Sequence, residues 1–476
     1  MSMAEHRWSL HGPDHHATGL LPRVLVIGAG MSGLIAARIL KDTGFPVTVV
    51  DARSRLGGRI WTDSTLGGPC DLGASWIHGV NKNPLTCWCR NLGIGICHIP
   101  HGKTRLYKAG DSYRLSLGLW RAKRGLSRAV LAYVRAFLAS RSRMGRGQNP
   151  ADTSLANVLY PVCRNPRLRK IDRQMIWWFI GLVETINGAP AEELGILEQD
   201  APEYWRSNAA PQGGFGNLID NAAEGLDIHL DTIVERVAHG PHGVELLTSR
   251  GSFWGDVAVV TLPVGVLRSG DVEFDPPLDH LKQDALSRIG YGGVLNKAAF
   301  RFSKRFWPPG HQKMASLPTD GRDRATYHVW TDFSDMAGCP LLVGYASGER
   351  AVSMDQASSD KDICKVALSR LKQMFSAQHA LPKRHVLTRW FSDPWSRGSY
   401  SYGAVESHVW DRQKLGEPLG NRLFFAGEAT HAVHYGTVHG ALLAGEREGR
   451  RIHRLFCCDH EAWGELPWRK KGVSTP

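Results

Sequence analysis

The chain has 476 residues, is 42% hydrophobic and carries a formal net charge of +13. This length and composition fit a globular protein with two sizeable domains, and no apolar run is long enough for a transmembrane helix. Its nine cysteines are irregularly spaced and match no metal-binding pattern, so we predict free thiols, no bound metal and a cytoplasmic location. Residues 1–22 lack the apolar segment of a secretory signal, and we expect a flexible tail there.

The first informative pattern is a glycine-rich turn between two apolar stretches. Residues 24–27 predict a buried strand, and residues 31–41, rich in Ala, Leu and Ile, predict a helix. The turn between them has the spacing G-x-G-x-x-G at Gly28, Gly30 and Gly33. In a dinucleotide-binding turn these glycines allow the tight turn, the approach of the backbone to a pyrophosphate, and close packing of the helix on the strand.

An acid follows the next strand. Residues 47–50 form a second β-branched run, and Asp51 comes directly after it. A carboxylate at this distance can accept hydrogen bonds from a ribose, while the helix N-terminus binds the pyrophosphate. The order strand, turn, helix, strand, acid therefore predicts a dinucleotide-binding unit within an α/β fold. An ordinary strand-to-helix turn is the alternative.

A second glycine pair narrows the choice of dinucleotide. Ala52 and Arg53 follow the acid, and Gly57 and Gly58 stand directly before Arg59. This arrangement gives a second close approach of the backbone, beside a guanidinium group suited to phosphate. A nicotinamide enzyme does not need such a second pair, so the pattern favours FAD.

The segment D-A-R-x-R-x-G-G-R at 51–59, followed by D-L-G-A-S-W-I-H-G at 71–79, resembles the flavin-containing amine oxidase family. That family includes polyamine oxidases, monoamine oxidases and lysine-specific histone demethylases. The resemblance extends from residue 23 to about 455. Its further motifs are G-G-F-G at 213–216, Val234, T-L-P-V-G-V-L at 261–267, F-D-P-P-L at 274–278, Lys297, the aromatic segment 390–402 and L-F-F-A-G-E-A-T-H-A-V-H-Y-G-T-V-H-G at 423–440.

The resemblance implies that FAD is the cofactor. Two positions depart from the family pattern: Asp51 replaces the usual glutamate, and Ser399 stands where monoamine oxidases attach flavin to a cysteine, so we expect noncovalent FAD. The positions that match cofactor-binding residues are Gly28, Gly30, Ser32, Gly33, Asp51, Ala52, Arg53, Gly58, Arg59, Gly73, Ala74, Ser75, Trp76, Val234, Trp390, Gly427, Glu428, Thr437 and Val438.

The resemblance also implies catalytic and substrate-binding residues. Lys297 matches the lysine that holds a water near flavin N5, although a surface lysine is the alternative. His78 and Tyr400 are the other catalytic candidates, because histidine exchanges protons near neutral pH and an aromatic face holds a cationic amine. The substrate candidates are Glu184, His78, Tyr400, Tyr435 and Gly436, with Glu198, Asp200 and His434 as weaker ones. Trp395 and Tyr402 are equally consistent with plain core, and Tyr400 and Tyr402 would share a face in an extended segment.

The cofactor motifs lie in three separate parts of the chain and must converge around one FAD. We therefore predict an α/β fold in which a Rossmann-like FAD-binding domain is interleaved with an α+β substrate-binding domain. The FAD-binding domain comprises 23–80, 208–287 and 406–476, and the substrate-binding domain comprises 81–207 and 288–405. A last helix over 437–456 would direct its N-terminus at the flavin.

The region 120–173 holds a dense run of arginine and lysine. Residues 127–140 predict a helix, on which Arg121, Arg124, Arg128 and Arg135 recur at helical spacing. A solvated helix face is the favoured interpretation, and contact with nucleic acid or an anionic membrane is the alternative.

These observations favour an FAD-dependent oxidase that acts with O2 on a polyamine, such as spermine, spermidine or their N-acetyl forms. By resemblance, a hydride passes from the carbon of a C–N bond to flavin N5, the imine is hydrolysed, and O2 reoxidises the flavin to give H2O2. One alternative is an oxidase of another amine, such as a monoamine, an amino acid or a biosynthetic intermediate. Another is a non-catalytic flavoprotein with an anionic partner. A histone demethylase is disfavoured because the sequence shows no added helical module.

Overall fold

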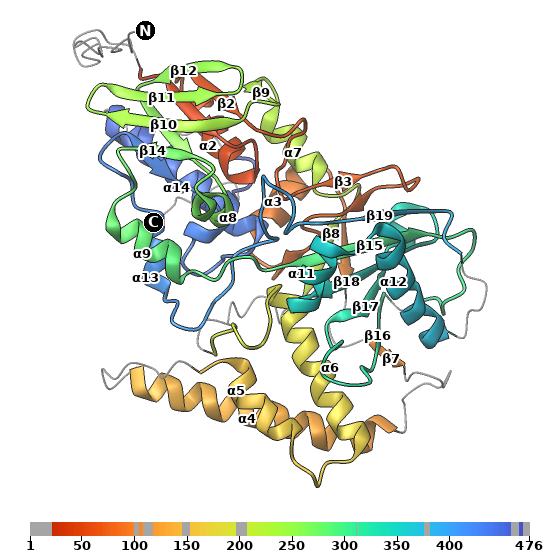
Figure 1. The fold of residues 1–476 in the computed structure, drawn as a ribbon. Coiled ribbons are helices and arrows are strands. Elements are labelled where there is room, and N and C mark those ends of the chain that lie inside the picture. The colour runs from red at the N-terminus through yellow and green to blue at the C-terminus, as the bar shows by residue number, and fades with distance from the viewer. Residues whose placement is uncertain are drawn as a thin grey trace, which may run out of the picture.

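The structure is a computed structural model that describes residues 21–99, 104–107, 118–144, 153–196, 207–310, 312–375, 381–457 and 466–469. Most of the tail predicted at 1–22 therefore lies outside the described residues, as do Glu198 and Asp200. The fold has two main β-sheets: one lies at one end of the molecule, and the other lies between it and a group of helices at the opposite end (Figure 1).

The N-terminal unit forms as its residue pattern predicts. Strand β1 (Val24–Ile27) is followed by helix α2 (Met31–Asp42) and strand β2 (Val47–Val50), and the two strands pair in parallel. All four residues of β1 are buried, which is expected for a strand that is covered on both faces. The helix predicted at 31–41 is thus confirmed.

A parallel sheet of five strands unites distant parts of the chain. Its order is β20 (Leu423–Phe425), β13 (Val257–Val260), β1, β2 and β9 (Asp227–His229). Helix α14 (Val438–Phe456) packs beside α2 on one face of this sheet, where a Cβ at Gly445 would lie 2.2 Å from the carbonyl oxygen of Ser32. Glycine at 445 therefore permits the close approach of the two helices.

A smaller sheet covers the other face of the parallel sheet. It consists of β12 (Gly251–Gly255), β11 (Gly243–Thr248), β10 (Val234–Gly240) and β14 (Glu273–Asp275), and Val237, Val244 and Leu246 join Leu25 and Ile27 in one apolar cluster. The remaining elements near this end are β3 (Thr62–Asp63), β4 (Cys70–Asp71), β5 (Ile77–His78), α3 (Pro84–Asn91), β6 (Ile96–Ile99), β8 (Asn208–Pro211), α7 (Gly216–Ala223), α8 (Val264–Ser269), α9 (His280–Arg288), α13 (Val409–Leu415) and η2 (Glu428–Thr430).

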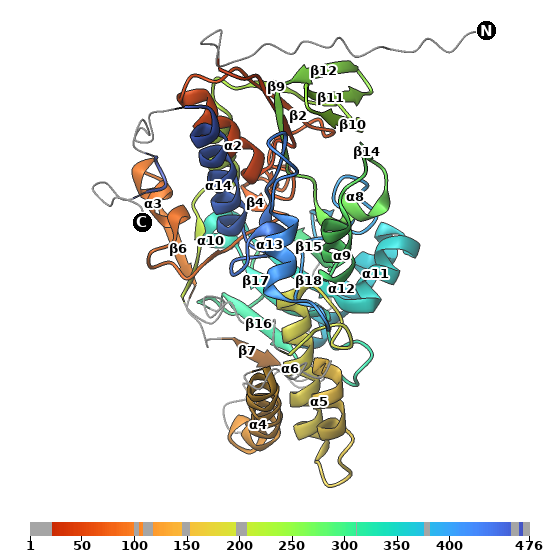
Figure 2. The same cartoon turned by 90° about the vertical axis from the view of Figure 1, so that its left-hand side faces the viewer.

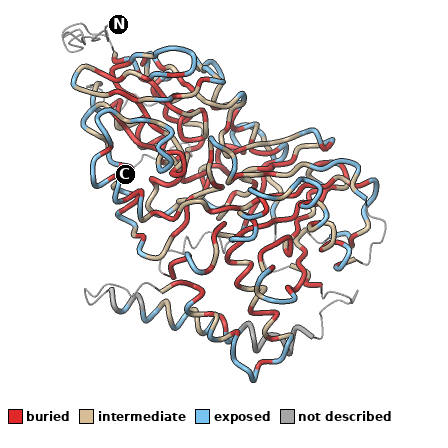
Figure 3. Tube along the Cα trace, in the orientation of Figure 1, coloured by how far each residue is buried: buried red, intermediate tan, exposed pale blue. Residues whose placement is uncertain are grey.

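The second main sheet is mixed and has six strands. Its order is β19 (Arg384–Leu387), β15 (Leu295–Arg301), β18 (Leu341–Ser347), β17 (Thr326–Asp332), β16 (Lys313–Ser316) and β7 (Arg105–Tyr107). Helices α11 (Gly348–Ala357) and α12 (Asp360–Phe375) pack against it, and α10 (Ser334–Ala337) precedes β18. The strands of both main sheets are mostly buried (Figure 3).

Three helices form the end of the molecule opposite the parallel sheet. Helices α4 (Gly118–Met144), α5 (Leu155–Cys163) and α6 (Lys170–Asn187) pack on one another, and α6 also contacts β18 (Figure 2). The helix predicted at 127–140 is confirmed and is longer than expected.

The structure confirms a mixed α/β fold that contains a parallel sheet. The strands of this sheet come from the three ranges predicted for the FAD-binding domain, whereas the six-stranded sheet comes from the two ranges predicted for the substrate-binding domain. The domain boundaries themselves stay a prediction.

Candidate active site

The glycine turn after β1 is sterically constrained at two positions and open at a third. Gly28 has φ of 109°, and a Cβ there would lie 2.4 Å from Oγ1 of Thr261. A Cβ at Gly33 would lie 1.9 Å from the carbonyl oxygen of Gly28. At Gly30, in contrast, the nearest atom to a Cβ is the carbonyl oxygen of Gly57 at 3.9 Å. Gly28 and Gly33 are therefore required by the fold, whereas Gly30 leaves room for another molecule.

Both carboxylate oxygens of Asp51 accept hydrogen bonds from the backbone. Its Oδ2 accepts a hydrogen bond of 2.7 Å from the N–H of Ala29, and its Oδ1 accepts one of 2.8 Å from the N–H of Arg53. Burial raises the pKa of Asp51, although the two backbone donors act against this shift. The carboxyl group thus joins the glycine turn to the start of the second motif.

Three further features fit a bound cofactor, and together with the glycine turn they are called the cradle: the Ser32 hydroxyl, the open space at Gly427 and a small pocket. The Ser32 hydroxyl, in the first turn of α2, is buried and forms no hydrogen bond with any described residue. A Cβ at Gly427 would meet no atom of the protein within 4 Å. A small pocket is lined by residues from three separate segments, among them Arg59, Pro263 and Glu428. A buried hydroxyl without a hydrogen-bond partner among the described residues, a helix N-terminus and the open space at Gly30 and Gly427 together fit an anionic group such as a pyrophosphate.

Glu428 connects three of the sequence motifs. It is 6% exposed, forms an ion pair of 2.8 Å with Arg59, and accepts hydrogen bonds from the hydroxyl of Ser401 (2.7 Å) and the N–H of Gly436 (2.6 Å). Burial disfavours the charged carboxylate, but the Arg59 guanidinium and these donors outweigh burial and lower the pKa of Glu428. An ionised Glu428 therefore holds the N-terminal, aromatic and C-terminal motifs together.

Arg412 completes this network and is not predicted by any sequence motif. Its guanidinium donates to the hydroxyl of Ser401 at 2.8 Å and to the carbonyl of Tyr402 at 3.0 Å, and its central carbon lies 3.6 Å from the centroid of the Tyr435 ring. Arg412 is 1% exposed. It lies on α13, between motifs, in a segment whose sequence has no distinguishing pattern. Only the tertiary structure brings it against Tyr435.

Lys297 is buried within the six-stranded sheet, so the alternative of a surface lysine is wrong. Its side chain is 3% exposed, and Nζ donates to the carbonyls of Asp71 (2.8 Å) and Gly73 (2.6 Å) and to the hydroxyl of Ser75. Burial lowers the pKa of Lys297 to about 8, which nearby Cys70 and Asp71 partly counteract. The residues that hold Nζ belong to the D-L-G-A-S motif.

A short chain of contacts connects Lys297 to the cradle. A Cβ at Gly73 would lie 2.0 Å from the carbonyl oxygen of Arg59, so these two backbones are in close contact. Arg59 in turn pairs with Glu428. The ammonium group, Gly73, Arg59 and Glu428 thus form one continuous arrangement.

The aromatic residues have different surroundings. Trp390 is 4% exposed and meets Trp61 edge-on, with the ring centroids 6.4 Å apart. The Tyr400 ring packs against Gly188, and its hydroxyl donates to the carbonyl of Ile186 at 2.9 Å. Tyr402 packs in the apolar cluster beneath α5 and α6 and pairs with Gly290 in an isolated bridge. The plain-core interpretation fits Tyr402.

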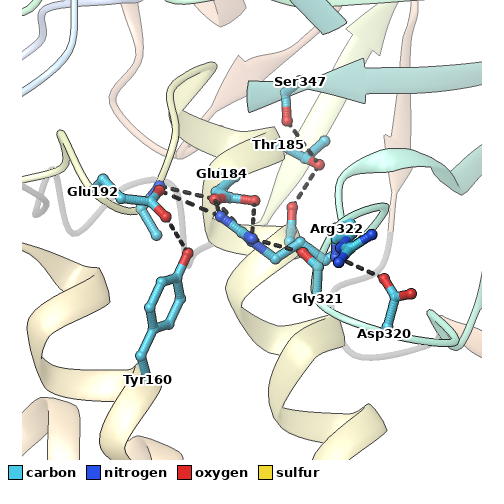
Figure 4. Close-up of polar contacts among 11 residues, drawn as sticks. Tyr160, Glu184, Thr185, Glu192, Asp320, Gly321, Arg322 and Ser347 are labelled. Atoms are coloured by element: carbon cyan, nitrogen blue, oxygen red, sulfur yellow. Dashed lines mark hydrogen bonds and ion pairs between the residues drawn. The ribbon is translucent and has the colours of Figure 1, made fainter. Parts of the chain in front are cut away.

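His78 and Glu184 both have partners inside the protein. Nδ1 of His78 lies 3.2 Å from Oδ1 of Asn208. Glu184, which is labelled on its helix in Figure 4, is 1% exposed. Its Oε2 accepts from Nε of Arg324 at 2.9 Å, and its Oε1 accepts from the N–H of Ala191 at 2.8 Å. The carboxylate is therefore neutralised within the fold. Its role as a substrate acid stays a prediction.

The last helix begins close to these groups. Its N-cap, Thr437, accepts a hydrogen bond of 2.9 Å from the N–H of Gly440 and follows Tyr435 and Gly436 directly. The ring of His434, a weaker substrate candidate, lies between those of His431 and His439, which are tilted against it at centroid distances of 4.8 and 4.7 Å. Among the described residues, no cluster of histidine, cysteine and acidic side chains has the arrangement of a metal site.

Comparison with known proteins decides the family. A family model described as flavin containing amine oxidoreductase matches residues 31–453. The chain belongs to the flavin-containing amine oxidoreductase family. Membership in this family supports FAD as the cofactor and an FAD-dependent amine oxidase as the type of enzyme, and it confirms the resemblance inferred from the sequence motifs.

Two kinds of relative are similar to this flavin amine oxidoreductase. Polyamine oxidase 4 of Oryza sativa subsp. japonica is 33% identical over 433 residues, which cover 89% of this chain and 87% of the relative. Lysine-specific histone demethylase 1 homolog 1 of the same organism is 32% identical over 453 residues, which cover 91% of this chain and 52% of the relative. The chain thus spans about half the length of that demethylase homologue and most of the polyamine oxidase.

A solved structure has the same fold. A double mutant of putrescine oxidase, made in a redesign of cofactor binding, superposes with a TM-score of 0.70 at 19% identity, covering 91% of this chain and 99% of the other. No helix among the described residues is long and apolar enough to cross a membrane.

Proposed function

We propose that this amine oxidase acts on a polyamine and holds its FAD without a covalent bond. The observation that carries the proposal is the convergence of three distant segments on one cradle, with the buried Lys297 joined to it through Gly73 and Arg59. The polyamine substrate is supported by the oxidases that are similar over most of both chains. We further propose that residues 23–80, 208–287 and 406–476 bind FAD and that 81–207 and 288–405 bind the amine.

In this proposal FAD accepts the hydride, and side chains of the protein position the reacting groups. Bound FAD supplies the acceptor for the hydride that leaves the carbon of the C–N bond, and its reoxidation by O2 gives H2O2. Water then hydrolyses the imine to a carbonyl compound and a shorter amine. Because its pKa is about 8, Lys297 is able to gain or lose a proton near neutral pH, and we propose that it positions the water near flavin N5.

Other side chains would bind the parts of the substrate and the cofactor. The Tyr400 ring would hold the cationic amine, and His78 would accept a proton from the nitrogen so that a neutral amine reacts. Ser32, Gly30 and the N-terminus of α2 would bind the pyrophosphate. The hydroxyl of Ser399 accepts a hydrogen bond of 2.8 Å from the N–H of Leu295, and a hydroxyl offers no thioether link to flavin.

A second candidate substrate is an amine with a single positive charge. Glu184, the acid expected to attract a distant ammonium group of a polyamine, is neutralised by Arg324. This pairing favours a monoamine, an amino acid or a biosynthetic intermediate over spermine. A non-catalytic flavoprotein is the third alternative, and it requires that Lys297→Met leaves function unchanged.

The test begins with protein purified without added cofactor. Acid precipitation should release FAD into the supernatant, whereas flavin that stays with the pellet would contradict noncovalent binding. The release of H2O2 is then measured with spermine, spermidine, N-acetylated polyamines, monoamines and amino acids. We expect turnover with at least one polyamine; turnover of a monoamine alone would favour the second candidate, and protein without flavin would overturn the proposal.

A further inference from the structure

Helix α4 has one face packed against the molecule and one face exposed. Ala129 is fully buried, and Ala132 and Tyr133 pack with it on the apolar cluster formed by α5 and α6. The helix runs along the outer edge of the molecule, at the end opposite the parallel sheet (Figures 1 and 2). Its outer side is therefore available to a partner.

The exposed side of α4 carries an aliphatic stripe. Val130, Leu131, Val134 and Leu138 are 40%, 48%, 41% and 59% exposed. At 3.6 residues per turn these four positions span an arc of roughly 100°, which is the width of the apolar face by which an amphipathic helix binds an apolar partner. Four of the thirteen large hydrophobic residues that are exposed in the described chain thus lie on a single helix.

Positive charge borders this stripe on one side. Arg128 and Arg135 are exposed, lie two turns apart, and form no ion pair with a described residue. The surrounding sequence has the same character, because residues 112–151 contain nine arginine and lysine residues and no aspartate or glutamate. Among the described residues and within this stretch of sequence, the two guanidinium groups therefore have no acidic partner.

We propose that this face of α4, formed by Arg128, Val130, Leu131, Val134, Arg135 and Leu138, docks on the surface of an anionic phospholipid bilayer. A helix that places aliphatic side chains at the acyl boundary and arginines at the headgroups lies in the plane of the membrane. The helix does not need to span the bilayer, and no described helix is able to do so. The inference is independent of the amine that the enzyme oxidises.

Two other occupants fit this face less well. A second copy of the chain would bring two strongly basic segments together, which costs electrostatic free energy. Nucleic acid would pair with Arg128 and Arg135, but Leu131 and Leu138 at the centre of the face would then meet phosphates and gain nothing. An anionic bilayer matches both the charge and the apolar stripe.

The test is flotation of the FAD-loaded full-length enzyme with vesicles. One set is pure phosphatidylcholine, and the other contains 30% phosphatidylserine, a composition chosen for the test. We expect binding to the anionic vesicles that weakens at high salt, and at least roughly tenfold weaker binding to the neutral ones. Replacing both arginines (Arg128→Gln, Arg135→Gln) should reduce the affinity roughly 25-fold, and replacing both leucines (Leu131→Ser, Leu138→Ser) at least roughly tenfold.

Matched variants separate this face from general surface effects. Leu381→Ser replaces a leucine that is 75% exposed elsewhere, and Lys361→Gln with Lys365→Gln removes two exposed charges from α12; neither should change vesicle binding. Amine oxidation and the melting temperature should be unchanged in every variant, because none of these residues contacts the candidate active site. Three outcomes would overturn the proposal: equal binding to both vesicle types, binding to duplex DNA that needs the arginines but not the leucines, or a dimer that is lost with the leucines.

Discussion

Two buried lysines of this protein have similar exposure, pKa and hydrogen bonding, but they lie in different parts of the fold. Lys297 and Lys282 are 3% and 1% exposed, and burial lowers the pKa of each to about 8. Each ammonium is held by three oxygens. For Lys282 these are the carbonyls of Lys414 and Leu415, both at 3.0 Å, and that of Glu417.

The difference between the two lysines lies in what their partners do. The carbonyls bound by Lys282 lie at or just beyond the C-terminal end of α13, so this ammonium caps a helix, with the Phe425 ring 4.1 Å away. The oxygens bound by Lys297 belong to the motif that packs on Arg59 and the glycine cradle. A lowered pKa therefore does not identify a catalytic lysine by itself; its position relative to the cofactor motifs does.

Substitution of the two lysines should differ most in its effect on the rate of amine oxidation. Lys297→Met should lower the rate of amine oxidation about 10³-fold, because it removes the group that positions a water and exchanges a proton. Steady-state release of H2O2 measures the effect, and the absorbance of bound flavin shows that the variant is folded and loaded. Turnover within about threefold of the wild type would remove Lys297 from the mechanism.

The lowered pKa values of both lysines should make the free energy of unfolding depend on pH. Between pH 8 and pH 10.5, the unfolded chain keeps a proton on each lysine that the folded chain has lost. The free energy of unfolding should therefore rise with pH across this window, by about 3 kcal/mol for each lysine, and the penalty of burying the two charges should be present below pH 8. Denaturant unfolding at several pH values tests this, and each Lys→Met variant should have a smaller slope. An unchanged slope in both variants would contradict the lowered pKa values.

Loss of the helix cap alone should reduce stability rather than activity. Lys282→Met leaves the carbonyls of Lys414, Leu415 and Glu417 without this donor, and above pH 10, where burial of the charge no longer opposes folding, we expect a loss of about 2 kcal/mol in the free energy of unfolding. Thermal or denaturant unfolding measures it, and kcat should stay within about threefold of the wild type. A large loss of kcat in a folded Lys282→Met enzyme would mean that the two lysines do not differ in role.

The smallest expected effect is a change in KM when Tyr400 is replaced. Tyr400→Leu removes the ring and should raise KM for the amine about tenfold through the lost cation–π contact. Tyr400→Phe keeps the ring and removes only the hydrogen bond to the carbonyl of Ile186, so KM should change little. Burial raises the pKa of Tyr400, which keeps its hydroxyl protonated as the donor in that bond. Equal KM values for the two variants would exclude a role for the ring.

The sequence predicts those parts of the site whose geometry is local. Gly28 and Gly33 follow from the turn that they form, and the helices at 31–41 and 437–456 follow from periodicity and from the N-cap Thr437. Lys297 was found through its motif, although its burial was not evident from the strand alone.

The sequence does not predict the remaining contacts of the site, because they join residues that are far apart in the chain. Arg412 reaches Tyr435, and Arg324 reaches Glu184, 140 residues away, and neither arginine stands in a recognisable motif. For α4 the spacing of its arginines predicted a basic face, of which Arg128 and Arg135 are exposed in the structure. The exposed aliphatic stripe was not predicted, because the sequence does not say which side of a helix packs against its neighbours.

The role of Lys297 is tested most directly by anaerobic mixing of the enzyme with spermine or, if spermine is no substrate, with the best amine from the H2O2 assay. Loss of the absorbance of oxidised flavin would be followed in the wild type, Lys297→Met and Lys282→Met. We predict rapid bleaching in the wild type, bleaching within about threefold of that rate in Lys282→Met, and a rate about 10³-fold lower in Lys297→Met. Equal rates in the two variants would contradict the assignment of Lys297 to the chemistry and of Lys282 to the fold.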